Sequence, residues 1–196
     1  MRPRATVTGA IAIPPAPGPA ERTMQAMAPT VLVLAFDERG PVPNNIRFPA
    51  LVYRQAFPAA LADLAGVMEQ RFEENGWPPA WRNGIYDFHH YHSQGHEALG
   101  IAKGSAELVL GGEGGRELNV CAGDVLLLPA GTGHRRLSAS SDFLVVGAYP
   151  PGQSGDILRD APTTAIRAAI AFLARPPADP VFGRDGPMLE RWSDGL

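Results

Sequence analysis

Residues 84–104 read GIYDFHHYHSQGHEALGIAKG, and residues 123–138 read GDVLLLPAGTGHRRLS. These two stretches contain all five histidines of a chain of 196 residues. In an extended strand successive side chains point to opposite faces, so His90 and His92 project to the same side. The spacing therefore predicts that these two imidazoles can share one metal ion.

A carboxylate and a further histidine extend the pair. Glu97 begins a second run of alternating residues, and His134 follows a turn rich in proline and glycine behind the apolar run at 125–128. Three neutral imidazoles and one carboxylate suit a divalent transition ion such as Mn, Fe, Co, Ni or Zn. Without a cation, these ionisable groups would be costly to bury. We predict that His90, His92, Glu97 and His134 bind one divalent transition metal ion and leave coordination positions open for water or substrate.

The two remaining histidines are weaker candidates. Strand alternation turns His89 away from the site, which indicates a structural role. His96 also faces away in a regular strand, but it lies at a loop-to-strand junction, where alternation can fail. It is a candidate hydrogen-bond partner of the ligands, a proton shuttle or a substitute ligand. His96 and Tyr86 are the predicted catalytic residues, because each can move a proton beside the ion, and Tyr86 is predicted to form the pocket wall with Trp81 and Arg82.

The order of these residues resembles the two-part cupin motif. Its first half has Gly84, five residues, His90, one residue, His92, four residues, Glu97, six residues and Gly104, and its second half has Gly123, five residues, Pro129, one residue, Gly131, two residues and His134. One departure is Ser138, where the cupin pattern usually has Asn. The segments RFEENGWPPAWRNGIYDFHHYHSQGHEALG, SDFLVVGAYPPGQ and DPVFGRDGPMLERW are similar to single-domain bacterial cupins of the YjlB type.

This resemblance implies an all-β fold: a cupin-type double-stranded β-helix, or jelly-roll barrel, with two or three flanking α-helices. Dimerisation through sheet edges is common among cupins, so a homodimer is expected. The resemblance covers most of the chain from about residue 29, and it implies no particular reaction.

Short alternating runs separated by glycine-rich turns are typical of such a barrel. Strands are predicted at residues 30–36, 46–54, 84–92, 97–103, 106–110, 117–121, 125–128, 134–137 and 142–149, and helices at 58–75 and 163–174. Pro49 predicts an edge position or a bulge for the second strand. The glycine-rich run at 111–115 lacks the lysine of a phosphate loop and predicts a hairpin turn. Leu61 is placed on the buried stripe of the first helix, and Trp192 is expected to anchor an irregular strap at 179–192.

The length of the chain favours one domain. Residues 1–28 are rich in Ala, Pro and Gly, which predicts an irregular leader. Residues 29–196 are predicted to form a single domain, with the metal-site core at 84–150 and a helical and irregular strap at 151–196. The lone cysteine, Cys121, has no partner for an internal disulfide and is predicted to be a buried, inert thiol.

Charge and hydropathy exclude several classes of partner. The net charge is −3 and the pI is near 5.9, and the sequence has no basic run of the density that nucleic acids require. No stretch reaches the roughly 20 apolar residues of a membrane span. We therefore expect a small-molecule ligand rather than a nucleic acid or a membrane. The single cysteine is consistent with a cytoplasmic location.

Two classes of function follow from these observations. One is a metal-dependent enzyme, dioxygenase-like or isomerase-like, that acts on a small oxygen-bearing substrate. The other is a non-catalytic cupin that binds or senses a small ligand, or whose ion is only structural. An open pocket lined with polar groups would favour the enzyme, and a pocket plugged by apolar side chains would favour a structural ion.

Overall fold

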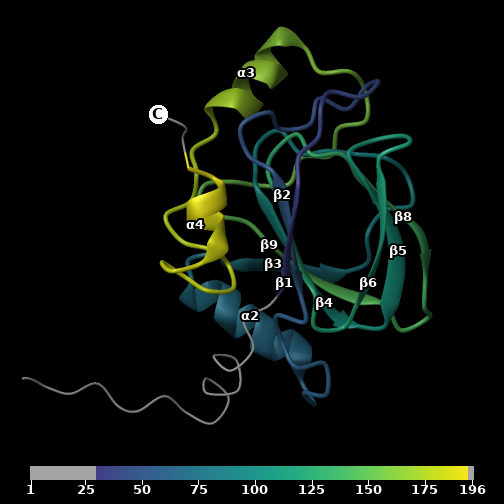
Figure 1. Ribbon diagram of the computed structural model, residues 1–196, viewed down its shortest axis with the longest axis vertical. Coiled ribbons are helices and arrows are strands. Elements are labelled where there is room, and N and C mark those ends of the chain that lie inside the picture. The colour runs from purple at the N-terminus through teal and green to yellow at the C-terminus, as the bar shows by residue number, and fades with distance from the viewer. Residues whose placement is uncertain (1–29, 194–196) are drawn as a thin grey trace, which may run out of the picture.

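The computed structural model describes residues 30–193, and they form two antiparallel sheets that face each other as a jelly-roll barrel (Figure 1). The six-stranded sheet has the order β1 (Thr30–Leu34), β2 (Ala50–Arg54), β7 (Val125–Leu128), β4 (Glu97–Lys103), β9 (Leu144–Ala148) and β3 (Pro79–Asn83). The three-stranded sheet has the order β6 (Arg116–Cys121), β5 (Ser105–Leu110) and β8 (His134–Ala139). The predicted all-β cupin-type fold is confirmed.

The four inner strands of the six-stranded sheet are buried on both faces, whereas the edge strands β1 and β3 are partly exposed. Along β4, Leu99 and Ile101 point into the barrel and pack with residues of the opposite sheet, whereas Ala98 and Ala102 belong to a second core on the outer face. Two-residue alternation produces this division, because neighbouring side chains leave the strand in opposite directions. Gly100 leaves room on the outer face, where an added Cβ would lie 2.8 Å from the sulfur of Met68.

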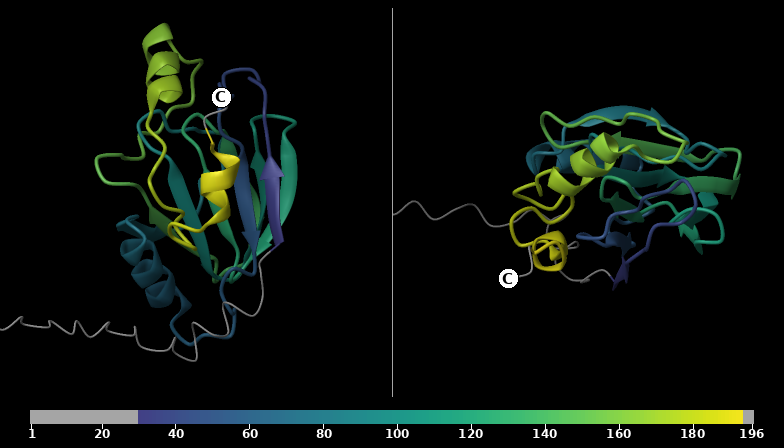
Figure 2. Two further views of the ribbon diagram at one scale, coloured as in Figure 1. Left: turned by 60° about the vertical axis from the view of Figure 1, so that its left-hand side comes forward. Right: turned by 90° about the horizontal axis from the view of Figure 1, so that it is seen from above.

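Between residues 30 and 193, three helices flank the barrel: α2 (Leu64–Glu74), α3 (Thr164–Phe172) and α4 (Pro187–Arg191). Helix α2 and the C-terminal tail cover the outer face of the six-stranded sheet (Figure 2). The predicted start of the first helix near Pro58 is wrong: the Asp63 carboxylate accepts a hydrogen bond from the Gly66 amide at 3.1 Å, which caps the helix there. Leu61 lies before this cap and is 37% exposed, so its predicted place on a buried stripe is also wrong.

Two strand predictions need correction. Residues 84–92 form no continuous strand, and only isolated bridges join His90 to His134 and Tyr91 to Leu158. The regular strand lies earlier, as β3, because that segment finds a partner in β9. The second strand is not at an edge: β2 lies between β1 and β7, and it begins directly after Pro49, so proline does not interrupt its hydrogen bonds.

Other predictions have mixed outcomes. Residues 111–115 form the predicted hairpin turn between β5 and β6. Trp192 is fully buried and donates from its indole nitrogen to the Pro49 carbonyl at 2.8 Å, which confirms the predicted anchor. Cys121 is exposed rather than buried, because alternate residues of β6 point to solvent.

The predicted leader at 1–28 lies outside the described residues. From residue 30 to residue 193, no helix has the length and apolar character needed to cross a membrane. The homodimer and the cytoplasmic location stay predictions.

Candidate metal centre

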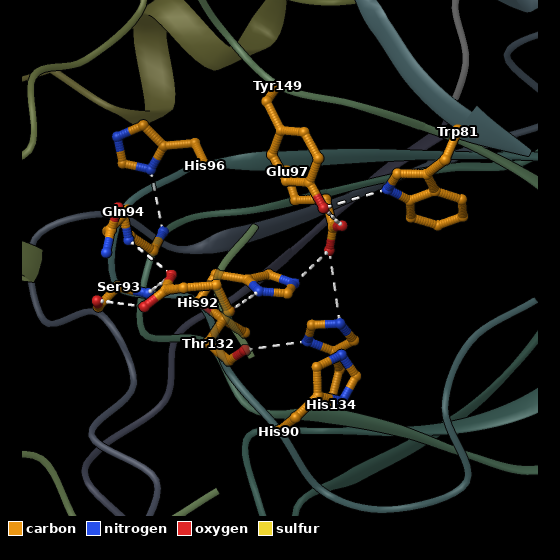
Figure 3. Close-up of polar contacts among 12 residues, drawn as sticks. Trp81, His90, His92, Ser93, Gln94, His96, Glu97, Thr132, His134 and Tyr149 are labelled. Carbon is orange, nitrogen blue, oxygen red and sulfur yellow. Dashed lines mark hydrogen bonds and ion pairs between the residues drawn. The ribbon is translucent and has the colours of Figure 1, made fainter. Parts of the chain in front are cut away.

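Three predicted ligands lie close together in the structure (Figure 3). His90, His92 and His134 are all buried, and each offers a ring nitrogen within 4.8 Å of those of the other two. The backbones of His90 and His134 exchange two hydrogen bonds, of 3.2 and 3.0 Å, which bring the segment at 84–92 beside the start of β8. Although that segment is no regular strand, the structure brings the predicted histidines together.

The second nitrogen of each ring is held by a backbone carbonyl. Nδ1 of His90 donates to Phe88 O at 3.2 Å, Nδ1 of His134 donates to Thr132 O at 3.1 Å, and Nδ1 of His92 donates to the carbonyl of Asp156. Carbonyl oxygens only accept hydrogen bonds, so these contacts place a proton on every Nδ1. In the neutral rings the Nε2 atoms then carry the lone pairs, which is the state that a metal ion requires.

Glu97 contacts two of these three rings. Its Oε2 atom lies 3.2 Å from Nε2 of His92 and 3.5 Å from Nε2 of His134. A carboxylate oxygen and a lone-pair nitrogen repel each other at such distances unless a proton or a cation lies between them. The donor set therefore fits a divalent cation, with the histidines as the tight group and Glu97 beside them.

The charges of this cluster oppose the effect of burial. Burial alone would lower the pKa of His92, but the charge and the hydrogen bond of Glu97 outweigh it and raise that pKa to about 9. Burial would raise the pKa of Glu97, yet His92, His134 and a tyrosine hydroxyl lower it to about 2. Burial lowers the pKa of His90 to about 4 and lowers that of His134 well below its usual value. Without a metal, these shifts favour a protonated His92 beside an ionised Glu97 near neutral pH.

Tyr149 and Trp81 hold the other oxygen of Glu97. The Tyr149 hydroxyl donates to Oε1, and the Trp81 indole nitrogen donates to that hydroxyl at 3.2 Å (Figure 3). Sequence reasoning named Trp81 only as a pocket wall and missed Tyr149. The register of β4 and β9 pairs Ala98 with Ala148 and so sets Tyr149 beside Glu97. That pairing has no signal in the local sequence.

A second missed residue, Asp156, shapes the turn behind His92. Its carboxylate accepts from the amides of Ser93 and Gln94 at 2.7 and 3.0 Å, and from the Ser93 hydroxyl at 2.6 Å. The carbonyl of the same residue accepts from the His92 ring. Asp156 thus fixes both the backbone after His92 and the orientation of its imidazole.

An open cavity of about 470 Å³ borders the centre, and its lining includes His90, His134 and Glu97. Polar side chains also line it, among them Tyr86 and Arg136. Tyr86 is 47% exposed, and its ring meets that of His90 edge-on at 5.1 Å. Trp81 lines the cavity as well, so two of the three residues predicted for the pocket wall, Tyr86 and Trp81, lie there. The volume is of the size that small-molecule sites commonly have.

Three other predicted residues lie away from the cavity. Arg82 pairs with Glu69 on the exterior. His89 is half-buried, and within residues 30–193 its ring nitrogens have no hydrogen-bond partner. His96 is fully buried between Phe48 and Trp192.

Both ring nitrogens of His96 bond to the backbone. Nδ1 accepts from the Ala130 amide at 3.0 Å, and Nε2 donates to the Ala174 carbonyl at 3.2 Å. The structure therefore does not bring this predicted catalytic residue to the histidine cluster. Its ring ties the segment after α3 to the turn before β8.

An antiparallel jelly-roll barrel that carries the two-part histidine motif, with its histidines gathered inside, defines a cupin. No protein-family model matches the chain. Over 159 residues it is 38% identical to the uncharacterized protein YjlB of Bacillus subtilis (strain 168), a match that covers 80% of this chain and 93% of the relative. The chain belongs to the YjlB family of cupins.

Solved structures give weaker likenesses. A DUF861 family protein from Thermotoga maritima is 21% identical with a TM-score of 0.29, covering 42% of this chain and 86% of that one. A mutant of Bacillus subtilis oxalate decarboxylase is 17% identical with a TM-score of 0.29, covering 79% of this chain and 34% of that one. The chain thus spans about a third of the decarboxylase, and neither likeness carries an argument about function.

Proposed function

We propose that this cupin is a divalent-metal-dependent enzyme that acts on a small oxygen-bearing substrate in the cavity beside the histidine cluster. One observation carries the proposal: three buried imidazoles each place a ring nitrogen within 4.8 Å of the other two, and two of them, His90 and His134, line an open, partly polar cavity. A purely structural metal site closes its coordination shell with protein side chains, whereas a site beside an open cavity can admit substrate.

His90, His92 and His134 would hold the ion, with Glu97 beside them. When bound, a divalent transition ion supplies Lewis-acid polarisation of a substrate oxygen or, if it is redox-active, activation of dioxygen. The backbone carbonyls that hold each Nδ1 keep the rings in one orientation, which limits the reorganisation that metal binding requires.

Other residues of the chain have complementary tasks. Tyr149 fixes the second oxygen of Glu97 and so limits rotation of that carboxylate. Tyr86 lies at the exposed border of the cavity and is positioned to pass a proton between substrate and solvent. His96 transfers no proton to the substrate, because both of its ring nitrogens are hydrogen-bonded to backbone groups.

Elemental analysis of protein purified without added metal tests the metal centre. We expect near-stoichiometric transition metal in the parent protein, and a large loss in His92→Ala and His134→Ala. His89→Ala is the matched control, because it removes the neighbouring imidazole that lies outside the cluster, and it should retain the metal. Equal metal content in the parent protein and His92→Ala would refute the site.

A turnover screen tests the catalytic half of the proposal. Metal-loaded protein is incubated in air with small oxo and hydroxy compounds, and their conversion is followed by NMR together with oxygen uptake. Conversion that disappears in His92→Ala supports an enzyme. Compounds that bind beside the ion and return unchanged throughout would instead support the non-catalytic binding or sensing function.

A further inference from the structure

Arg136 is a cationic residue on the wall of the cavity. It follows His134 by two residues on β8, where the register pairs His134 with Leu110 and Arg136 with Leu108. Both leucines are buried in the core between the two sheets. The pairing is regular over these residues, so His134 and Arg136 leave the strand on the same face, and both line the cavity.

The guanidinium of Arg136 is held in place by the segment across from it. Its Nε donates to the Ile85 carbonyl at 3.0 Å, and its backbone amide donates to the Tyr86 carbonyl at 2.8 Å. Within residues 30–193, its two terminal amino groups make no hydrogen bond and no ion pair. An arginine anchored through Nε presents its terminal fork in a set direction, ready for a planar acceptor.

The charges around the cavity indicate what this fork binds. Arg136 is the one cationic side chain among the described lining residues, and the acidic ones are Glu97 and Asp87. Glu97 is already engaged by Tyr149 and by the histidines, and Asp87 is exposed. One guanidinium matches the single charge and the two coplanar oxygens of a carboxylate. A phosphate dianion carries a second negative charge, and no second lysine or arginine is among the described lining residues.

The remaining wall suits a short carbon skeleton. Leu99 and Ile157 contribute apolar surface to the lining. We propose that the cavity binds a small carboxylic acid with a second oxygen substituent, such as a 2-oxo or 2-hydroxy acid, and that Arg136 binds its carboxylate. This inference rests on the proposed function, because it assigns the substrate class of the same site.

Calorimetric titration tests the assignment with pyruvate and lactate as probes, and with their uncharged amides, pyruvamide and lactamide, as matched comparisons. In the parent protein we expect the acids to bind at least about tenfold more tightly than the amides. Arg136→Gln should weaken acid binding about 10- to 100-fold and remove the preference, since it deletes a charge-assisted hydrogen-bond pair. Arg136→Lys keeps the charge without the fork and should restore only part of the affinity.

Arg135→Gln is the matched control, because Arg135 is adjacent on β8, faces the other side and does not line the cavity. It should bind the acids as the parent protein does. Thermal melts verify folding, and if Arg136→Gln is unfolded, Arg136→Lys decides the outcome. Acid binding unchanged in the folded Arg136 variants, or amides bound as tightly as acids, would overturn the proposal. Inorganic phosphate bound more tightly than either acid, in a manner dependent on Arg136, would overturn it in favour of a phosphate ligand.

The metal content of the same samples separates this inference from the proposed function. Arg136 is not a predicted ligand, so Arg136→Gln should retain the metal of the parent protein. A parent protein without metal would refute the proposed function. The titrations of the Arg136 variants test whether acid binding depends on Arg136, whatever the metal content proves to be.

Discussion

Metal uptake should release about one proton per ion near neutral pH. Nε2 of His92 lies 3.2 Å from Oε2 of Glu97, and this contact raises the pKa of His92 to about 9 against the opposing effect of burial. The metal-free protein therefore holds a proton on this pair throughout the neutral range. Metal ligands must be deprotonated, so the ion has to displace that proton.

The magnitude follows from the pKa. A pH of 7 is about two units below the pKa of His92, so the proton is bound in nearly all molecules. Displacing it weakens the apparent metal affinity about 100-fold, or by about 3 kcal/mol, compared with the affinity above pH 9. Affinity should thus rise about tenfold per pH unit between pH 6.5 and 8.5. Glu97→Gln removes the charge that holds the proton, so this slope should largely disappear even if the variant binds metal more weakly.

Zinc titrations against a competing chelator at several pH values would measure the slope. Calorimetry in buffers of different ionisation enthalpy would count the protons released. A metal affinity that does not change between pH 6.5 and 8.5, after correction for the chelator, would refute the reasoning. So would an equal slope in Glu97→Gln.

Three further predictions concern stability. Trp192→Ala should lower the unfolding free energy by about 3–5 kcal/mol, because the ring is fully buried, whereas Phe172→Ala, at a residue 85% exposed, should change it by less than about 0.5 kcal/mol in the same urea titration. Gly147→Ala should cost about 1–3 kcal/mol and lower the Tm, since its Cβ would lie 2.0 Å from a ring carbon of Trp81; an unchanged Tm would contradict the close packing. Burial lowers the pKa of His96 to about 4 in the folded protein, below the unfolded value near 6.5. The neutral ring therefore contributes about 3 kcal/mol to the unfolding free energy above pH 6.5, and this contribution is lost as the pH falls to 4. Urea titrations across this range should show a smaller loss in a His96→Leu variant, and equal losses would count against the reasoning.

Much of the barrel was predictable because its signals are local. The alternation at residues 97–103 and the apolar run at 125–128 gave the bounds of β4 and β7 as the structure has them. Glycine-rich and proline-rich turns marked the breaks between strands. The segment at 84–92 failed because alternation shows an extended backbone but does not show whether another strand lies beside it.

In the candidate site, too, residues with a local sequence signal were predicted and residues without one were missed. The histidine spacing predicted the cluster, since His90 and His92 are close in sequence and His134 follows a recognisable turn. Tyr149, Asp156 and Arg136 were missed because they reach the site through pairing between distant segments. A tyrosine just after a strand, or an arginine within one, has no distinctive local pattern.

Residue order alone was enough to predict an all-β barrel, the histidine cluster and the kind of ion that suits it, because each depends on periodicity, turn chemistry and ligand type over short distances. Only the folded chain revealed that His96 bonds to the backbone away from the cluster, that Tyr149 holds Glu97, and that an arginine lines an open cavity beside the cluster. These features depend on hydrogen-bond register between strands and on how the tail packs. Register is set by the packing of the whole core, and no short stretch of sequence encodes it.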